Sequence, residues 1–269
     1  MDLTKSFSFV VQKKCPHVTA DPSGIWISYH HYSYDEHNIA LYDETGHLLK
    51  SIEVQCPIRR MASDRNGHLY LASVDAQCVM VFDVATSDIK ELAHFDGYPS
   101  GLAYCEKDDS LIVCDNECPS YFAYEGGYAR LVKFHLSTHE CQERILIPCE
   151  NHHNCISNVA IGKNESLWTA DYINDTVFQM TSDGHVTFSY NGPADDTVLN
   201  PLDICTDKQG RVFVICTSSK CVYVLGETGQ HEASLSLDYM PCSVEVHGGR
   251  IWIGEMDANK IHVYTYTVK

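Results

Sequence analysis

The sequence predicts an all-β fold, a six-bladed β-propeller with four strands in each blade, and two observations support this prediction. A short pattern recurs six times: a turn, alternating branched or aromatic residues, and then a small or polar residue. The copies end at positions 29, 73, 115, 171, 216 and 255, so the steps between them are 44, 42, 56, 45 and 39 residues. A propeller blade repeats every ~40 to 45 residues. We therefore expect residues 1–269 to form a single six-bladed domain.

Each copy is expected to be the second strand of its blade. A shorter strand and a turn precede it, as in residues 201–210, where Asp207 and Gly210 are typical of a tight turn. A third alternating run follows in residues 38–43, 79–83, 176–180 and 221–225. Polar turns such as residues 44–46 and 227–229 then lead into a fourth strand. Four strands per repeat complete a blade.

The two ends of the chain predict how the ring closes. After its copy of the pattern, the last repeat has room for only one more strand before the chain ends at residue 269. Residues 6–11 have the alternation of a strand but belong to none of the six repeats. We therefore expect residues 1–12 to supply the outer strand of the last blade, which closes the ring and removes exposed sheet edges.

The charge balance disfavours nucleic-acid binding. The chain has 36 acidic and 19 basic residues and a formal net charge of −17, and such a field repels a phosphate backbone. No apolar run of about 18 residues and no secretory signal pattern is visible. We expect a soluble cytoplasmic monomer that does not bind membranes, with its thirteen scattered cysteines mostly reduced and buried.

The repeats resemble the NHL repeat, in which Pro-x-x-Ile-x-x-Asp-x-x-Gly-x-Val-aromatic-Val precedes a polar loop and Val-x-Val. Residues 239–246, 251–255 and 259–264 are similar to the closing repeat of the carboxyl-terminal propellers of tripartite-motif proteins. The resemblance implies a platform that recruits proteins or, with a basic face, RNA. It raises the hypothesis of a substrate-recruiting domain of a ubiquitin-ligase-type protein, although this chain has no zinc-binding RING or B-box pattern and no coiled-coil heptads.

Propeller geometry brings two sets of positions together on one face, near the axis. The starts of the first strands are His17, Arg60, Gly101, Asn158, Asp203 and Ser243; the ends of the second strands are Tyr29, Ser73, Asp115, Asp171, Cys216 and Glu255. These polar positions either hold water and cap strand ends or form a site. The sequence leaves both interpretations open.

The leading hypothesis is a non-catalytic scaffold that binds a protein or peptide, without a cofactor, on this face. Arg60 is placed to meet a carboxylate of the partner. Two aromatic loops, residues 29–37 and 116–128, would supply contact area of the kind found in binding hot spots. The candidate binding residues are Arg60, Tyr29, His31, Tyr32, Tyr34, Tyr121, Tyr124, Tyr172, Asp171 and Glu255.

Two alternatives stay open. One is a metal-dependent lactonase or other hydrolase similar to gluconolactonase-like propellers, which hold one divalent ion at the axis. Its ligands here would be His17, Asn158 and Asp203, but a histidine replaces the expected carboxylate and Arg60 would place a like charge beside the ion. The other alternative is RNA binding, which needs a basic face interleaved with aromatics; the lysines here are dispersed.

Overall fold

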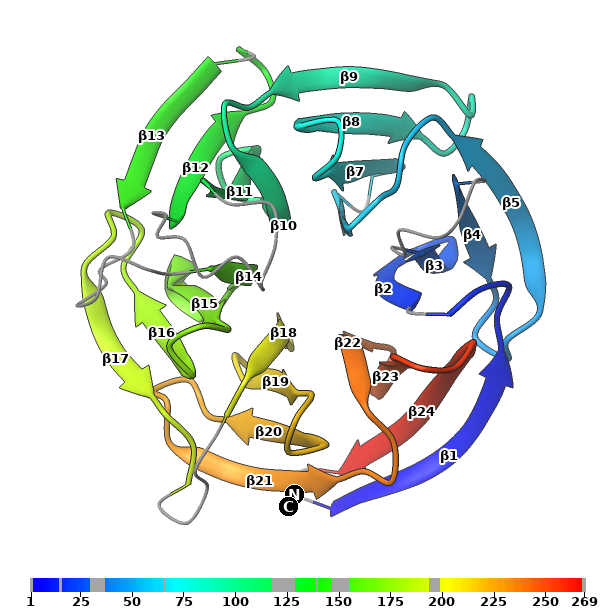
Figure 1. Ribbon diagram of the computed structural model, residues 1–269, viewed down its shortest axis with the longest axis vertical. Helices are drawn as coiled ribbons and strands as arrows, with labels where there is room; N and C mark the ends of the chain where they lie inside the picture. Colours follow the sequence, from blue (N-terminus) through cyan, green and yellow to red (C-terminus); the bar gives the residue numbers. More distant parts are fainter. Residues whose placement is uncertain are drawn as a thin grey trace.

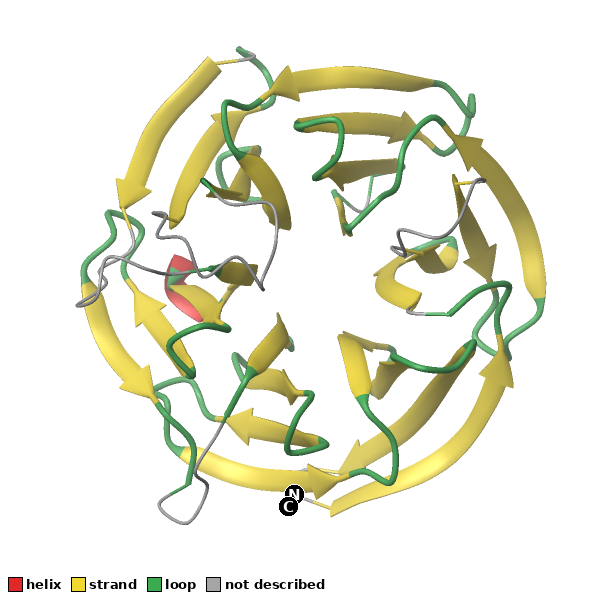
Figure 2. Cartoon of the chain, in the orientation of Figure 1, coloured by secondary structure: helices red, strands yellow, loops and turns green. Residues whose placement is uncertain are grey.

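Six sheets of four antiparallel strands are arranged as blades around an axis, which confirms the predicted six-bladed propeller (Figure 1). The computed structural model describes residues 2–14, 16–29, 37–64, 66–117, 129–138, 140–146, 155–193 and 199–267. Within these residues the connections are turns and loops, apart from one 3-10 turn at Lys163–Glu165 (Figure 2). No helix in the described part of the chain has the length and apolar character needed to cross a membrane.

The blades follow one another along the chain, and each runs from an inner strand at the axis to an outer strand at the rim. Blade 1 contains β2 (Pro16–Asp21), β3 (Gly24–Tyr29), β4 (His37–Tyr42) and β5 (Leu48–Val54). Blade 2 contains β6 (Arg60–Ser63), β7 (His68–Ser73), β8 (Cys78–Asp83) and β9 (Ile89–His94). Blade 3 contains β10 (Tyr98–Cys105), β11 (Ser110–Asn116), β12 (Ala129–His135) and β13 (Glu140–Leu146).

The second half of the ring repeats this plan. Blade 4 contains β14 (Ile156–Ile161), β15 (Leu167–Asp171), β16 (Thr176–Met180) and β17 (Val186–Tyr190). Blade 5 contains β18 (Pro201–Thr206), β19 (Val212–Cys216), β20 (Cys221–Leu225) and β21 (His231–Ser236). Blade 6 contains β22 (Pro241–His247), β23 (Arg250–Glu255), β24 (Lys260–Thr267) and β1 (Asp2–Val10).

The second strands of the blades are the six copies of the sequence pattern, and they are the most deeply buried elements. Trp26, Trp168 and Trp252 stand at equivalent positions of β3, β15 and β23, and each is 0% exposed. The outer strands instead alternate between exposed and half-buried residues, as the period of two requires for a sheet with one wet face. The core therefore lies between blades and close to the axis.

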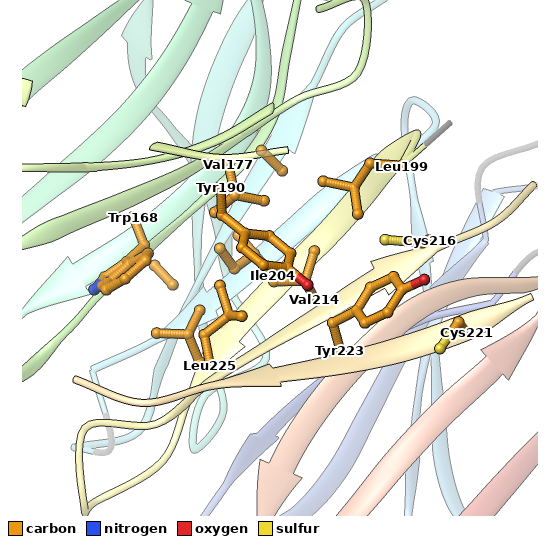
Figure 3. Packing of buried hydrophobic residues seen from close by; sticks show 13 residues of the cluster. Trp168, Val177, Tyr190, Leu199, Ile204, Val214, Cys216, Cys221, Tyr223 and Leu225 are labelled. Atoms are coloured by element: carbon orange, nitrogen blue, oxygen red, sulfur yellow. The ribbon is translucent and has the colours of Figure 1, made fainter. Parts of the chain in front are cut away.

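The space between neighbouring blades is filled by large side chains from both sheets. In Figure 3, Trp168, Val177 and Tyr190 of blade 4 face Val214 and Tyr223 of blade 5. The Tyr190 and Tyr223 rings meet edge to face, with their centroids 6.2 Å apart. Such contacts fix the angle between two blades, since protein interiors tolerate little empty space.

The sequence predicts that most cysteines are buried, and the structure confirms this for cysteines in several blades. Cys78, Cys105, Cys114 and Cys205 are buried free thiols, and burial raises the pKa of each. Cys56 is only half-buried.

The ring closes as the sequence predicts. β1 pairs antiparallel with β24, so the two chain ends lie side by side at the rim (Figure 1). Phe9 lies against two blades at once, with its ring centroid 6.3 Å from that of Trp252 and 5.6 Å from that of Tyr42. Just beyond β1, the N–H of Val11 donates to the carbonyl of Asn259 at 2.8 Å. The first strand thus links blade 6 to blade 1.

We expect deletion of residues 2–11 to lower the free energy of unfolding by more than about 3 kcal/mol, because it removes buried aromatic contacts and exposes the edge of β24. Chemical denaturation followed by circular dichroism measures this change. The control is Ser8→Ala, an exposed position on the same strand, which should stay within about 0.5 kcal/mol of wild type. Unchanged stability of the truncated chain would contradict the closure.

Candidate functional site

The inner strands of the six blades begin on the same face, and side-chain hydroxyls join the start of one to the start of the next. Ser100 Oγ donates to the Ile156 carbonyl at 2.8 Å, Ser157 Oγ to the Pro201 carbonyl at 3.2 Å and Ser243 Oγ to the Pro16 carbonyl at 2.7 Å. We call this the loop face. The opposite face, where the inner strands end, is the turn face.

Six positions of the inner strands form one layer at the loop-face end of the axis. Each is defined by its antiparallel partner on the second strand, which is Ser28, Ala72, Cys114, Ala170, Ile215 or Gly254. This first layer consists of His17, Arg60, Gly101, Asn158, Asp203 and Ser243, the set expected from the sequence.

Asp203 is the centre of this layer and is 0% exposed. Its Oδ1 accepts hydrogen bonds from Asn158 Nδ2 at 2.6 Å and from its neighbour's amide, Ile204 N, at 3.0 Å. Its Oδ2 accepts from Val244 N of blade 6 at 2.9 Å. The Oδ1 of Asn158 in turn accepts from Leu102 N of blade 3 at 3.3 Å. One carboxylate and one amide therefore connect the inner strands of four blades.

A cation and a histidine complete what we call the axial cluster: His17, Arg60, Asn158 and Asp203. Arg60 reaches from blade 2 to blade 5 on the opposite side of the ring, where Nε lies 3.7 Å from Asp203 Oδ1 and Nη2 donates to the Leu202 carbonyl at 3.2 Å. His17 Nε2 lies 3.9 Å from Asp203 Oδ2. All four residues are buried, so the loop-face end of the axis is filled by polar groups that bind one another.

Burial controls the protonation of the cluster. Desolvation lowers the pKa of His17 well below its usual value, and the Arg60 and Arg59 charges add to this effect. His17 is therefore neutral at neutral pH. Desolvation also raises the pKa of Asp203, while Arg60 and the hydrogen bonds to the carboxylate act in the opposite direction.

The axial cluster does not fit a divalent ion. Both oxygens of Asp203 and the Oδ1 of Asn158 already accept hydrogen bonds from the chain. The Arg60 guanidinium lies where it would repel a metal ion, and a catalytic metal centre needs several converging deprotonated ligands. Among the described residues, no group of three or more His, Cys, Asp or Glu side chains is arranged to hold a metal ion.

The candidate residues at the ends of the second strands are also engaged within the fold. Asp171 is 0% exposed, and its Oδ1 accepts from Ile173 N at 3.1 Å. Burial raises its pKa, while hydrogen bonds from Asn174 and the backbone act in the opposite direction. Tyr29 is buried, and its hydroxyl accepts from Gln12 N at 3.2 Å.

Two further candidates lie nearer the surface. Glu255 is half-buried and pairs with His262 Nε2 at 2.9 Å, whereas Tyr172 is half-buried against the core between blades 5 and 6. Arg60, Tyr29 and Asp171 are thus buried and hydrogen-bonded within the fold rather than exposed to a partner. His31, Tyr32, Tyr34, Tyr121 and Tyr124 lie outside the described residues.

A cavity of about 230 Å³ lies on the axis below the axial cluster, and the sequence argument missed it. Its lining runs from His17 and Asn158 along the inner strands to Asp64, Glu106 and Thr206, which lie at or just after the ends of β6, β10 and β18 on the turn face. The missed signal is the run of small residues in the middle of the inner strands, such as Ala62 and Ala103.

The comparisons with known proteins establish the fold alone. No family model matches the chain, and no curated protein matches it by sequence. Among solved structures, virginiamycin B lyase from Staphylococcus aureus, crystallised as a catalytically inactive H270A form with quinupristin, aligns with a TM-score of 0.67 at 12% identity over 99% of this chain and 100% of that one. A streptogramin B lyase structure aligns with a TM-score of 0.65 at 16% identity over 100% of this chain and 88% of that chain.

A propeller domain whose name describes no enzyme is similar to the same degree. The Cps50 (Swd1) β-propeller domain of Myceliophteria thermophila has a TM-score of 0.68 at 10% identity over 99% of this chain and 100% of that one. Since lyases and a propeller with no enzymatic name align equally well, the structural similarity does not indicate a function for this chain.

We expect Asp203→Ala to lower the free energy of unfolding by about 3–5 kcal/mol, because it leaves the Arg60 charge buried without its counter-charge. The double variant with Arg60→Met should recover part of the loss, with a coupling energy above about 1 kcal/mol in a double-mutant cycle. Asp257→Ala, which removes an exposed carboxylate, is the control and should change little. Additive effects of the two axial substitutions would contradict the pairing.

The neutral state of His17 predicts a loss of stability in mild acid. Its folded pKa is depressed from 6.5, so its contribution is present above that pH and is lost as the unfolded state gains a proton below it. Between about pH 7.5 and pH 5.5, wild type should lose about 1.4 kcal/mol more than His17→Gln in urea unfolding. His94→Gln changes an exposed histidine and should keep the wild-type slope. Equal slopes for His17→Gln and wild type would contradict this assignment.

Proposed function

We propose that this chain is a non-catalytic propeller that binds a protein or peptide at its loop face. The observation that carries the proposal is that the side chains of the axial cluster bond to one another and to the backbone of the inner strands. Asp203, the acidic group of the first layer, is occupied by the chain's own donors and by Arg60. A face whose axial groups hold the blades together offers contact area rather than a reactive centre.

The loop face also has the longer connections. Residues 30–36, 117–128, 147–155 and 191–200 join strands that end and begin on this face, whereas residues 22–23, 43–47 and 207–211 make short turns on the other. The longer connections carry Tyr32, Tyr34, Tyr121 and Tyr124, and tyrosine is enriched where proteins bind partners. Unequal loops on a rigid scaffold are the usual basis of specific binding.

The described part of this face contributes apolar surface. Ile173 lies in the turn between β15 and β16, and its side chain is 39% exposed. Its neighbour Tyr172 is half-buried. A partly exposed aromatic and aliphatic pair is the kind of anchor that a peptide covers on binding.

The charge of the chain favours a basic partner. With a net charge of −17, the protein attracts cationic surfaces and speeds their association. Basic side chains pair with acidic ones in several blades, as Arg130 does with Asp115 at 2.7 Å and Lys163 with Glu227 at 3.4 Å. These ion pairs oppose the RNA alternative, which needs unpaired basic groups on one face.

The resemblance to NHL repeats supports the same proposal, since those propellers recruit proteins. A role as the substrate-recruiting domain of a ubiquitin-ligase-type protein rests on that resemblance alone. The lactonase alternative loses support, because the ligands it requires, His17, Asn158 and Asp203, are hydrogen-bonded or placed beside Arg60.

We expect peptides selected from a random display library on the immobilised protein to be rich in Lys and Arg and to bind at the loop face. The triple variant Tyr32→Ala, Tyr34→Ala, Tyr124→Ala should bind the selected peptides at least about tenfold more weakly, because it removes aromatic contact area. Fluorescence anisotropy with labelled peptides measures the dissociation constants.

The matched control is Leu49→Ser, which removes an exposed apolar side chain from β5 at the rim. It should leave the dissociation constants unchanged. Peptides that bind the triple variant as tightly as wild type would place binding elsewhere and would contradict the proposal.

A further inference from the structure

The axial cavity is created by a second layer of inner-strand residues, two positions beyond the axial cluster. Its members pair with Trp26, Tyr70, Ile112, Trp168, Phe213 and Trp252 on the second strands. All six members line the cavity. The layer consists of Thr19, Ala62, Ala103, Ala160, Cys205 and Glu245.

Five of these side chains are small and one is a carboxylate. The small residues leave the space that the axial cluster fills one layer above, and Glu245 is the charged residue of the layer. Glu245 is half-buried rather than enclosed. Sites for drug-sized ligands occupy roughly 300–1,000 Å³, so this cavity of about 230 Å³ takes a smaller group.

The charged side chains that line the cavity are acidic. Asp64 and Glu106 lie towards the turn face, and Glu245 lies further in, whereas no Lys or Arg is among the lining residues. Lys107 and Arg211 pair with carboxylates outside the lining, Glu165 and Asp207, whereas His68 Nδ1 lies 2.7 Å from Asp64 Oδ2. A lining with carboxylates and without Lys or Arg favours a cation over an anion.

The inner end of the cavity offers a hydrogen-bond acceptor. His17 lines this end and is 4% exposed, and its Nδ1 has no hydrogen-bond partner among the described residues. Its Nε2 is the nitrogen nearer to Asp203, so a proton on Nε2 is favoured electrostatically and leaves Nδ1 as an acceptor. A ligand with N–H donors matches this end.

The walls supply further acceptors. Each inner strand pairs with a neighbour on one side only, so about half of its backbone groups face the axis. Some are taken by side chains, as Thr19 Oγ1 donates to the Met61 carbonyl at 2.9 Å and Thr206 Oγ1 to the Ile161 carbonyl at 2.8 Å. The remaining N–H and C=O groups that face the cavity need partners from water or from a ligand, and the carbonyls among them are acceptors for a cationic donor.

We propose that the axial cavity binds a primary ammonium group on a short alkyl chain, with the ammonium beside Glu245 and access from the turn face. An ammonium has three donors and no acceptor, which matches the lining carboxylates, His17 Nδ1 and the backbone carbonyls that face the axis. The site is separate from the loop face, so it does not depend on the proposed peptide binding. The buried charge of Arg60 above the cavity is offset by Asp203.

The first probe is n-butylammonium, measured by isothermal titration calorimetry, with n-butanol as its uncharged counterpart. We expect the amine to bind and the alcohol not to bind. Glu245→Gln keeps the shape of the side chain and should weaken binding of the amine at least about tenfold, because it removes a charge-assisted hydrogen bond. Glu53→Gln, which makes the same charge change at an exposed position of β5, should bind as wild type does.

A second variant tests the cavity itself, independently of charge. Ala103→Leu fills the second layer from blade 3 and should abolish binding, and each variant is first checked for an intact melting transition. A lysine-containing pentapeptide titrated beside the free amine distinguishes a side chain from a small molecule as the natural source. Absence of binding by both ammonium probes would overturn the proposal, as would undiminished binding by Glu245→Gln or by Ala103→Leu.

Discussion

A propeller ring must satisfy the backbone at its axis, where every inner strand has a free edge. An unpaired N–H or C=O that is buried costs about as much as a lost hydrogen bond. Here Asp203 takes donors from blades 4, 5 and 6 and the charge of Arg60 from blade 2. A carboxylate can do this because it has four acceptor sites and no donor. This one buried group therefore ties the inner strands of blades 4, 5 and 6 to one another and to blade 2.

The same interaction limits what the loop-face end of the axis can do. A buried carboxylate is tolerated only when charges and donors surround it, so Arg60 cannot leave the cluster without exposing Asp203 to that cost. His17 beside them stays neutral because burial and two arginine charges depress its pKa. Both proposed binding sites therefore lie outside this cluster, one on the loop face and one in the axial cavity.

The sequence predicts the ring well because each blade carries its own signals. The alternation around Trp26, Trp168 and Trp252 marks strands that pack on both faces. Turn residues such as Asp207 and Gly210 separate the strands: Gly210 has a φ of +87°, and its own N–H and that of Gln209 donate to Asp207. These signals are local, and they repeat with one period. Even the closure by β1 can be deduced, since a strand without a blade and a blade without a strand must pair.

The site is less predictable because its contacts run between blades. The sequence places Arg60 and Asp203 in one layer, but it does not show that they meet across the ring. Arg60 is therefore expected to meet a carboxylate of a partner, and in the structure it is buried beside the carboxylate of Asp203. Register places Thr19, Ala62 and Glu245 in the layer below, yet the cavity becomes visible only once the inner strands are set around a common axis.

Departures from the repeat are the most informative positions in such a fold. Every blade meets the axis in the same way, so a layer selected for stability alone would have side chains of similar size and polarity in all six blades. The second layer has a small residue in five blades and Glu245 in the sixth. A half-buried carboxylate costs more to desolvate than the alanine found at the same place in blades 2, 3 and 4. The proposed ammonium ligand would offset part of that cost, which is why the departure at Glu245 is the position to test first.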